Sequence, residues 1–303
     1  MMTGVAKKGK RMNLARRDNI EGYAFIGPAL IGLLVFLMYP IVADFYISLH
    51  NWSVLEEPSW AGIQNYTRMF SDEVFLVSLG NTLLWVVLYV PLSIVVSFLL
   101  ALAMNLPLKG IKTFRTIFYV PVVTPLLVVA LLFVWMYNTD FGLINYILYL
   151  FGINPIPWLT NKYIALPAIA LMSIWKYCGY NMVIILAALQ GIPAHLNEAA
   201  MLDGITPWKK TWHITIPLIT PALYYILVMA VIDAFQVFTE IYIMTSGGPG
   251  YATHTLNYYM WKNAFSYYEM GYASAISVFM LVIILFVTLI QSKFLGSRVQ
   301  YDL

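Results

Sequence analysis

Charged residues and cysteine are scarce in this chain. Only 10% of its 303 residues are charged, whereas an average soluble domain is about a quarter charged. The single cysteine, Cys178, excludes an intrachain disulfide. The histidines lack the spacing of a ligand set, so we expect no metal site; they are His50, His195, His213 and His254. The composition therefore points away from a soluble domain and from a disulfide or metal scaffold.

Hydrophobic residues make up 61% of the chain and fall into long runs. The hydrocarbon core of a bilayer is about 30 Å thick, which takes about 20 helical residues to cross. A backbone in lipid must pair its own polar groups, so these runs are expected to be helices. We predict an all-α integral membrane protein with spans at 23–48, 79–104, 115–137, 164–189, 218–242 and 271–293. A basic tail (1–22) would precede this domain (23–293), and a second tail (294–303) would follow it.

Basic residues are concentrated on one predicted side of the membrane. Six spans place both termini on the same side, and loops rich in Lys and Arg face the cytoplasm. The side with the termini carries thirteen, namely Lys7, Lys8, Lys10, Arg11, Arg16, Arg17, Lys109, Lys112, Arg115, Lys209, Lys210, Lys293 and Arg298. The opposite side carries only Arg68, Lys162 and Lys262. We therefore predict that both termini are cytoplasmic.

The predicted external loops are rich in aromatic residues. They contain Trp52, Trp60, Tyr66, Trp158, Tyr258, Tyr259, Trp261, Tyr267 and Tyr268. Such residues form belts at membrane interfaces, and they also stack on sugars; the sequence does not separate these two roles. The run Gly247–Gly250 cannot stay helical, so we expect it to end the fifth span in an external turn.

Loop 190–217, predicted to be cytoplasmic, has the signals of two short surface helices. Pro193 suits the first turn of one helix, and Gly204 suits the position just past its end. Thr206 is a candidate N-cap for the second helix, with Pro207 at its first position. A loop built from two helices can press into a groove of a partner and transmit motion rigidly.

The loop resembles the signature of binding-protein-dependent ABC permeases, which is Glu-Ala-Ala, three residues, Gly, nine residues and Ile-x-Leu-Pro. This chain has Glu198-Ala199-Ala200, Gly204 and Ile214-Thr215-Ile216-Pro217. Ile216 stands where the pattern prefers Leu, which is an exchange of one apolar residue for another. The loop also lies between the fourth and fifth predicted spans, where the family has it. Three further segments resemble the sugar-permease branch of this family, namely Gly27-Pro28-Ala29-Leu30, Tyr39-Pro40 and Gly247-Gly248-Pro249.

This resemblance implies a multi-pass subunit of a type I ABC importer in the bacterial cytoplasmic (inner) membrane. The implied partners are a second similar permease, two cytoplasmic ATPase subunits and an external solute-binding protein, without nucleic acid. The residues implied to couple to the ATPases are Glu198, Ala199, Ala200, Asp203 and Gly204. The chain has no Gly-x-x-x-x-Gly-Lys-Ser/Thr, so we expect ATP and Mg to bind to the partner ATPases. We expect no cofactor and no catalytic residue in this chain.

Polar residues form one stripe in the fourth predicted span and another in the fifth. Each stripe lies on one helical face; the first is Ser173, Lys176, Tyr177 and Tyr180, and the second is Asp233, Gln236 and Glu240. Ionisable groups at membrane depth normally face a cavity or a partner. In the resembled family the substrate lies midway through the membrane against these spans, which implies a substrate pathway along the first stripe and along Asp233 and Gln236 of the second. Alternatively, Lys176 and Asp233 form an ion pair that only joins the two helices. The two interpretations are compatible, because a buried ion pair can also bind solute hydroxyls. Glu240 is expected near the outer boundary, where water can solvate it.

The sequence leaves alternatives open for both the solute and the energy source. A neutral oligosaccharide fits best, but Lys176 could also hold an anionic solute such as a sugar acid or glycerol phosphate. An ion-coupled secondary transporter would carry intramembrane Lys176 and Asp233 as well, but it would not need loop 190–217. That class usually shows broken helices in two matching halves, and we find no internal repeat. An intramembrane enzyme is disfavoured, because His-Glu-x-x-His and Gly-x-Ser-x-Gly are absent from the sequence.

Overall fold

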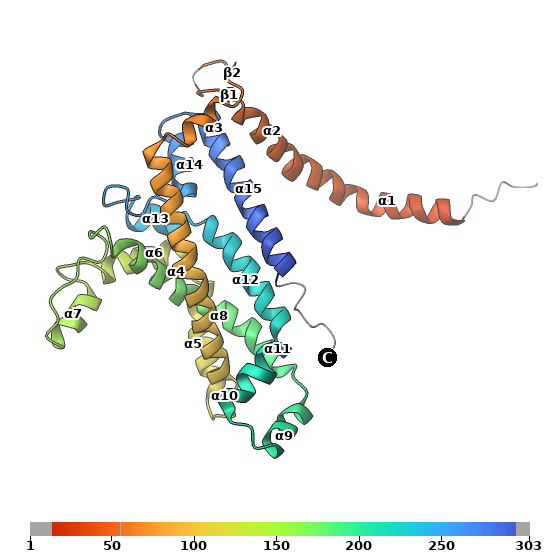
Figure 1. The fold of residues 1–303 in the computed structure, drawn as a ribbon, viewed down its shortest axis with the longest axis vertical. Helices are drawn as coiled ribbons and strands as arrows, with labels where there is room; N and C mark the ends of the chain where they lie inside the picture. The colour runs from red at the N-terminus through yellow and green to blue at the C-terminus, as the bar shows by residue number, and fades with distance from the viewer. Residues whose placement is uncertain (1–13, 55, 295–303) are drawn as a thin grey trace, which may run out of the picture.

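The computed structural model describes residues 14–54 and 56–294, which are mostly helical (Figure 1). Residues 1–13 of the predicted basic tail, and Arg298 with the rest of 295–303, lie outside the described residues. The first elements are α1 Leu14–Leu33, the π-helix η1 Leu34–Met38, α2 Tyr39–Ser48, β1 His50–Asn51, β2 Ser59–Trp60, α3 Gln64–Met69 and α4 Glu73–Met104. There follow α5 Ile111–Val123, α6 Leu126–Met136, α7 Leu143–Leu150, α8 Ala165–Gln190, α9 Ala194–Leu202, α10 Pro207–Lys210 and the π-helix η2 Thr211–Thr215. The last are α11 Ile216–Leu218, α12 Thr220–Phe235, α13 Thr239–Met244, α14 Leu256–Phe265 and α15 Met270–Phe294.

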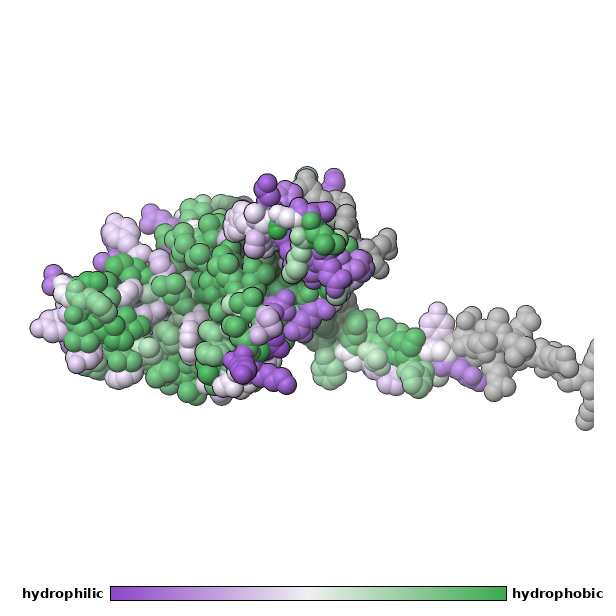
Figure 2. Space-filling model, turned by 90° about the horizontal axis from the view of Figure 1, so that it is seen from below, coloured by the Kyte–Doolittle hydropathy of each residue, from purple (hydrophilic) through white to green (hydrophobic). Residues whose placement is uncertain are grey.

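Four helical runs in the described part of the chain are long and apolar enough to cross a membrane. They are Glu21–Ser48, Glu73–Met104, Ala165–Gln190 and Met270–Phe294. Two further pairs of helices pass the same test together but are bent, so the number of spans is four, or up to six if each bent pair crosses once. Apolar side chains cover much of the surface of the body and of the projecting N-terminal helix (Figure 2), as expected of a protein whose solvent is lipid.

The first of these runs extends away from the rest of the protein. Its C-terminal part, α2, packs against α15, whereas α1 projects outward (Figure 1). No residue in the apolar window of this run is buried. The helix α1 begins at Leu14, so part of the segment 1–22 that was predicted as a basic tail is helical.

The predicted third span is broken rather than straight. Its two parts, α5 and α6, meet at an angle of 99°. Thr124 precedes Pro125, and a proline disfavours the helical conformation of the residue before it. Thr124 accordingly has extended backbone angles (φ −73°, ψ 135°). A break of this kind leaves backbone carbonyl groups without their helical partners, which is costly in an apolar medium.

Lys176 supplies the missing hydrogen bonds at this break. Its Nζ donates to the carbonyl oxygens of Thr124 (2.8 Å), Pro121 (3.0 Å) and Val122 (3.4 Å). The side chain comes from α8, which approaches α5 closely because Gly179 has no Cβ; a Cβ there would overlap the carbonyl oxygen of Phe118. Lys176 is only 2% exposed. It therefore closes the C-terminal end of α5.

The ion pair between Lys176 and Asp233 that was one interpretation of the sequence is wrong. Among the described residues, the ammonium group of Lys176 donates to three carbonyl groups and forms no ion pair with Asp233. Helical spacing places both residues at similar depth, but it carries no information on carbonyl groups freed by a break in another helix.

The predicted fifth span is also interrupted. The run Pro207–Leu218 meets Thr220–Phe235 at 73°. Pro221 cannot donate a backbone hydrogen bond to Pro217, and the hydroxyl of Thr220 donates to the Pro217 carbonyl instead (2.7 Å). At the other end α12 stops at Phe235 rather than continuing to 242, and α13 begins only at Thr239.

The long helix α4 is the central support of the body. It packs against α8, α12 and α14. Its buried face is a stripe at helical spacing, made of Ser78, Thr82, Trp85, Tyr89, Ser93 and Ser97. The serine and threonine hydroxyls bond to carbonyl groups of their own helix, as Ser97 does to Ser93 (2.6 Å), so the small polar residues are satisfied within α4.

One carboxylate joins three helices at the end of α4 near β1 and β2 (Figure 1). Asp72 caps α4 by accepting hydrogen bonds from the amides of Val74 and Phe75. It also accepts hydrogen bonds from the hydroxyls of Tyr259 in α14 (2.6 Å) and Tyr272 in α15 (2.7 Å). Burial opposes the ionisation of Asp72, but these four donors hold its pKa below the ordinary value.

The contacts of Lys176 predict the effect of removing its charge. Lys176→Met keeps the length of the apolar stem but leaves the carbonyl groups of α5 unpaired, at about 1–3 kcal/mol for each buried group. We expect the purified protein in detergent to lose thermal stability, and adding Asp233→Leu should not restore it. The matched control is Lys162→Met, which removes an exposed lysine and should have little effect. Recovery of stability in the double variant would contradict this account.

Candidate functional site

A cavity of about 550 Å³ lies where α4, α8 and α12 approach the α5–α6 break and α13. Aromatic and polar residues that line it are Trp85, Tyr89, Ser173, Tyr177, Tyr180, Asn181, Tyr225, Asp233, Gln236, Phe238, Thr239 and Glu240. The apolar remainder of the wall is Val122, Leu126, Ile226, Met229, Ala230, Ala234 and Val237. Of the elements that form the wall, α6 and α13 lie about midway along the vertical axis of Figure 1.

Three of the four residues predicted from α8 reach this cavity. Ser173, Tyr177 and Tyr180 line it, as their spacing of four and three residues on one helical face predicts. Lys176 does not line it, because its ammonium group is directed to the carbonyls of α5. Lys176 also lies above the ring of Tyr177, with Nζ 5.0 Å from the ring centre. The lysine thus lies behind one wall residue.

Both residues predicted from the end of α12, Asp233 and Gln236, line the cavity as well. Both side chains are exposed, although the surroundings of α12 are largely apolar. Gln236 is the first residue after the helix, and its carbonyl oxygen accepts a hydrogen bond from Asn257 (2.6 Å). This hydrogen bond fixes the end of α12 in place, and the side-chain amide of Gln236 remains free to face the cavity.

Glu240 is a further acidic residue of the cavity, and the sequence-based expectation that water solvates it is wrong. The residue is only 7% exposed, and the hydroxyl of Ser173 lies 3.5 Å from its Oε1. The expectation assumed a straight helix to residue 242. Because the helix stops at Phe235 and Phe238 is not helical (φ −143°, ψ −58°), α13 returns Glu240 to the cavity wall.

Two aromatic residues of α4 were not identified from the sequence. Trp85 and Tyr89 form part of the wall, and their rings stack with centroids 5.7 Å apart. The signal that could have found them is the stripe of small polar and aromatic residues at helical spacing through α4 described above. Single Ser and Thr residues in an apolar run are common in membrane helices, so the stripe alone does not indicate a cavity.

The lining groups determine what the cavity can hold. Hydroxyl and amide groups donate and accept hydrogen bonds, carboxylates accept them, and aromatic faces cover apolar surface. Such a mixture suits a polyhydroxylated small molecule better than an apolar one. Within the part of the chain that the structure describes, no group of three or more His, Cys, Asp or Glu residues is placed to hold a metal ion.

Loop 190–217 forms a second candidate site at one end of the protein. Its first helix, α9, begins after Pro193 and ends in a Schellman motif: the amide of Gly204 donates to the carbonyl of Met201 (3.1 Å) and that of Ile205 donates to Ala200 (3.1 Å). Gly204 has φ +67°, a left-handed conformation that glycine adopts without strain. This turn gives the Glu-Ala-Ala-x-x-x-Gly pattern a structural reason.

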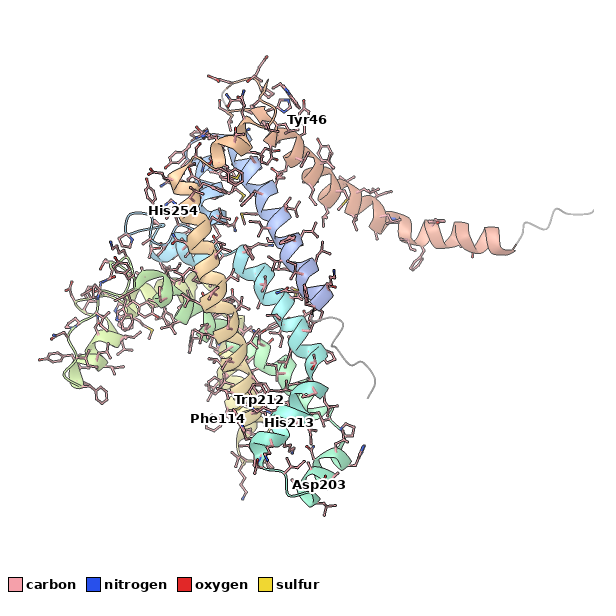
Figure 3. All side chains as sticks on the ribbon, in the orientation of Figure 1. Tyr46, Phe114, Asp203, Trp212, His213 and His254 are labelled. Atoms are coloured by element: carbon pink, nitrogen blue, oxygen red, sulfur yellow. The ribbon has the colours of Figure 1, made fainter. Side chains whose placement is uncertain are left out.

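The outer surface of this loop combines charged and apolar residues. Glu198, Ala199 and Asp203 are exposed, while Ala200 is buried. Large apolar side chains lie exposed beside them, namely Met201, Leu202, Trp208 and Trp212. Leu202 is 89% exposed, so no residue in the described part of the chain covers it to any large extent. In Figure 3 Asp203, Trp212 and His213 lie together at the end of the molecule opposite Tyr46.

The chain is similar to known transport proteins over most of its length. The family described as binding-protein-dependent transport system inner membrane component matches residues 93–300. The chain is 37% identical over 298 residues to the probable ABC transporter permease protein YesP of Bacillus subtilis, covering 97% of this chain and 96% of YesP. It is 36% identical to the trehalose/maltose transport system permease protein MalF of Thermococcus litoralis, covering 92% of this chain and 95% of that protein.

A solved structure has a closely similar fold. It is a bacterial ABC transporter involved in the import of the acidic polysaccharide alginate, with a TM-score of 0.82 and 26% identity over 94% of this chain and 98% of that chain. The family match covers more than half of the chain, and the resemblance inferred from loop 190–217 is confirmed. This chain belongs to the binding-protein-dependent transport system inner membrane components, the permease subunits of ABC transporters.

Proposed function

We propose that this protein is one of two permease subunits of an ATP-driven importer that passes sugars through the bacterial cytoplasmic membrane. The observation that carries the proposal is the cavity at mid-height, whose wall combines aromatic faces with hydroxyl, amide and carboxylate groups. These are the groups that hydrogen-bond and stack on sugars. Two of the relatives are named for carbohydrates, one for the transport of trehalose/maltose and the other for the import of alginate.

The external partner in this proposal is a solute-binding protein, in line with the description of the family. The other half of the pathway comes from a second, similar permease. No residue in the apolar window of the N-terminal helical run Glu21–Ser48 is buried. In the assembled importer, lipid or the second permease then covers this apolar surface. The solute would pass from the binding protein into the cavity between the two permeases.

The energy comes from two ATPase subunits that hold ATP and Mg and dock on loop 190–217. The exposed residues Leu202, Trp208 and Trp212 supply apolar contact area, and Glu198 and Asp203 flank it with charge. Apolar patches of this kind, rimmed by polar groups, mark protein interaction sites. In this assignment Glu198, Ala199, Ala200, Asp203 and Gly204 are the coupling residues, and this chain does not hydrolyse ATP.

The orientation follows from the positions of the charges. Lys109, Lys112, Lys209 and Lys210 belong to the segments around α5 and α10, which lie at the same end in Figure 1. The opposite end carries Glu56 and Glu57 beside β2. By the positive-inside rule the end with α9 and α10 is cytoplasmic, with each bent pair counted as one of six spans.

Coupling is tested by two substitutions in the loop. We expect Glu198→Lys and Gly204→Val to leave the subunit inserted, to reduce co-purification of the ATPase subunits and to lower uptake at least tenfold. Solute binding by the external protein should not change. Glu57→Lys makes the same charge change at the opposite end, and Gly152→Val the same change at a glycine with φ +74°, so both are matched controls. Unchanged uptake in both loop variants would overturn the coupling assignment.

Orientation is tested by labelling of single cysteines. With Cys178→Ser as the background, Ser59→Cys should react with a membrane-impermeant thiol reagent in intact cells, because Ser59 lies in β2 at the predicted outer end and is exposed. Ala194→Cys in α9, also exposed, should react only after the cells are opened. The reverse pattern would show that the protein is inserted the other way round.

A further inference from the structure

We propose that the cavity accepts uncharged sugars and rejects acidic ones, such as uronates and sugar phosphates. This inference rests on the proposed function and specifies the solute class of the same site. It is carried by the charge of the cavity wall: the charged residues in it are Asp233 and Glu240, both acidic, and none of the lysines and arginines that the structure describes lines it.

Lys176 lies behind the wall residue Tyr177, and its charge is already occupied. The ammonium group of Lys176 can donate three hydrogen bonds, and three backbone carbonyl oxygens accept from it at 2.8–3.4 Å. To reach an anionic solute, Lys176 would have to leave the carbonyls of α5 unpaired at a break in a membrane helix. The charge that could balance a uronate or a phosphate is therefore held in the wall and serves the fold.

The acidic groups of the wall oppose an anion directly. Asp233 and Gln236 are exposed in the cavity, and Glu240 lies beside Ser173. Beside a protein wall of low polarity, charge repulsion is screened less than in bulk solution. An ionised carboxylate has no hydrogen to donate to a second carboxylate, but it accepts hydrogen bonds from sugar hydroxyls. The carboxylates of the wall thus bind uncharged sugars through hydrogen bonds, and the same carboxylates repel an acidic sugar.

The aromatic part of the wall supports the same solute class. Trp85 and Tyr89 stack on each other at one side, and Tyr177, Tyr180 and Tyr225 come from α8 and α12. These faces cover the C–H surface of a sugar ring, and the tyrosine hydroxyls bond to its hydroxyl groups without requiring charge. Membership of the family does not decide the matter, because relatives serve neutral trehalose/maltose and acidic alginate alike.

The experiment measures binding to the assembled importer in the absence of its binding protein, so that only the cavity selects. The purified complex is dialysed against an equimolar mixture of neutral trisaccharides (maltotriose, cellotriose, xylotriose, mannotriose) and acidic ones (trigalacturonate, trimannuronate), and retained sugars are quantified by mass spectrometry. We expect neutral sugars to be retained at least tenfold more than acidic ones. Asp233→Asn combined with Glu240→Gln should reduce this ratio at least fivefold.

Two further variants separate charge from fit. Tyr180→Ala should weaken retention of the neutral sugars without changing the ratio, and Glu56→Gln with Glu57→Gln, which removes two acids outside the cavity, should change neither. Acidic sugars retained as well as neutral ones, or a ratio unaffected by the double amide variant, would overturn this inference while leaving a sugar permease in place. If the wild-type complex retains no sugar of either kind, the proposed function itself fails and the inference fails with it.

Discussion

The structure depends on how backbone groups are paired where membrane helices break. In lipid no water is available to satisfy a free carbonyl, so each interruption needs a partner from the protein. At the α5–α6 break the partner is Lys176, and at the bend before α12 it is the hydroxyl of Thr220. Interruptions of the helices also make room for the cavity. The α5–α6 break places Val122 and Leu126 in its wall, and a third interruption, the end of α12 at Phe235, allows Glu240 to return to it.

The same arrangement relates the cavity to loop 190–217, at the end of the protein proposed to be cytoplasmic. Loop 190–217 directly connects the two helices that contribute most of the predicted pathway residues, because α9 follows α8 and α12 follows α11. Ser173, Tyr177 and Tyr180 lie on the first of these helices and Asp233 on the second. In the proposed function a displacement of the loop by the ATPases would therefore move two walls of the cavity relative to each other, without a separate transmitting element.

Sequence reasoning was sufficient where a local rule determines the structure. Pro193, Gly204, Thr206 and Pro207 mark helix ends through their own backbone preferences: α9 has the predicted bounds within a residue, and α10 begins at Pro207 as predicted. Long apolar runs likewise indicate membrane helices. The destination of Lys176 was not predictable, because it depends on carbonyls more than fifty positions away that a break in another helix exposes. Glu240 was misplaced for a similar reason, since spacing assumes a helix that does not end at Phe235.

In the proposed function, the cavity between α8 and α12 is a water-filled part of the solute pathway. The most direct measurement is the reactivity of Gln236→Cys with an impermeant thiol reagent in the reconstituted importer, with Cys178→Ser as the background. The account predicts that Gln236→Cys is modified and that the accessible side changes between nucleotide-free and ATP-bound complexes. Val87→Cys, on the exposed outer face of α4, should stay unmodified in lipid. A Gln236→Cys variant that resists modification from both sides in every nucleotide state would contradict the account.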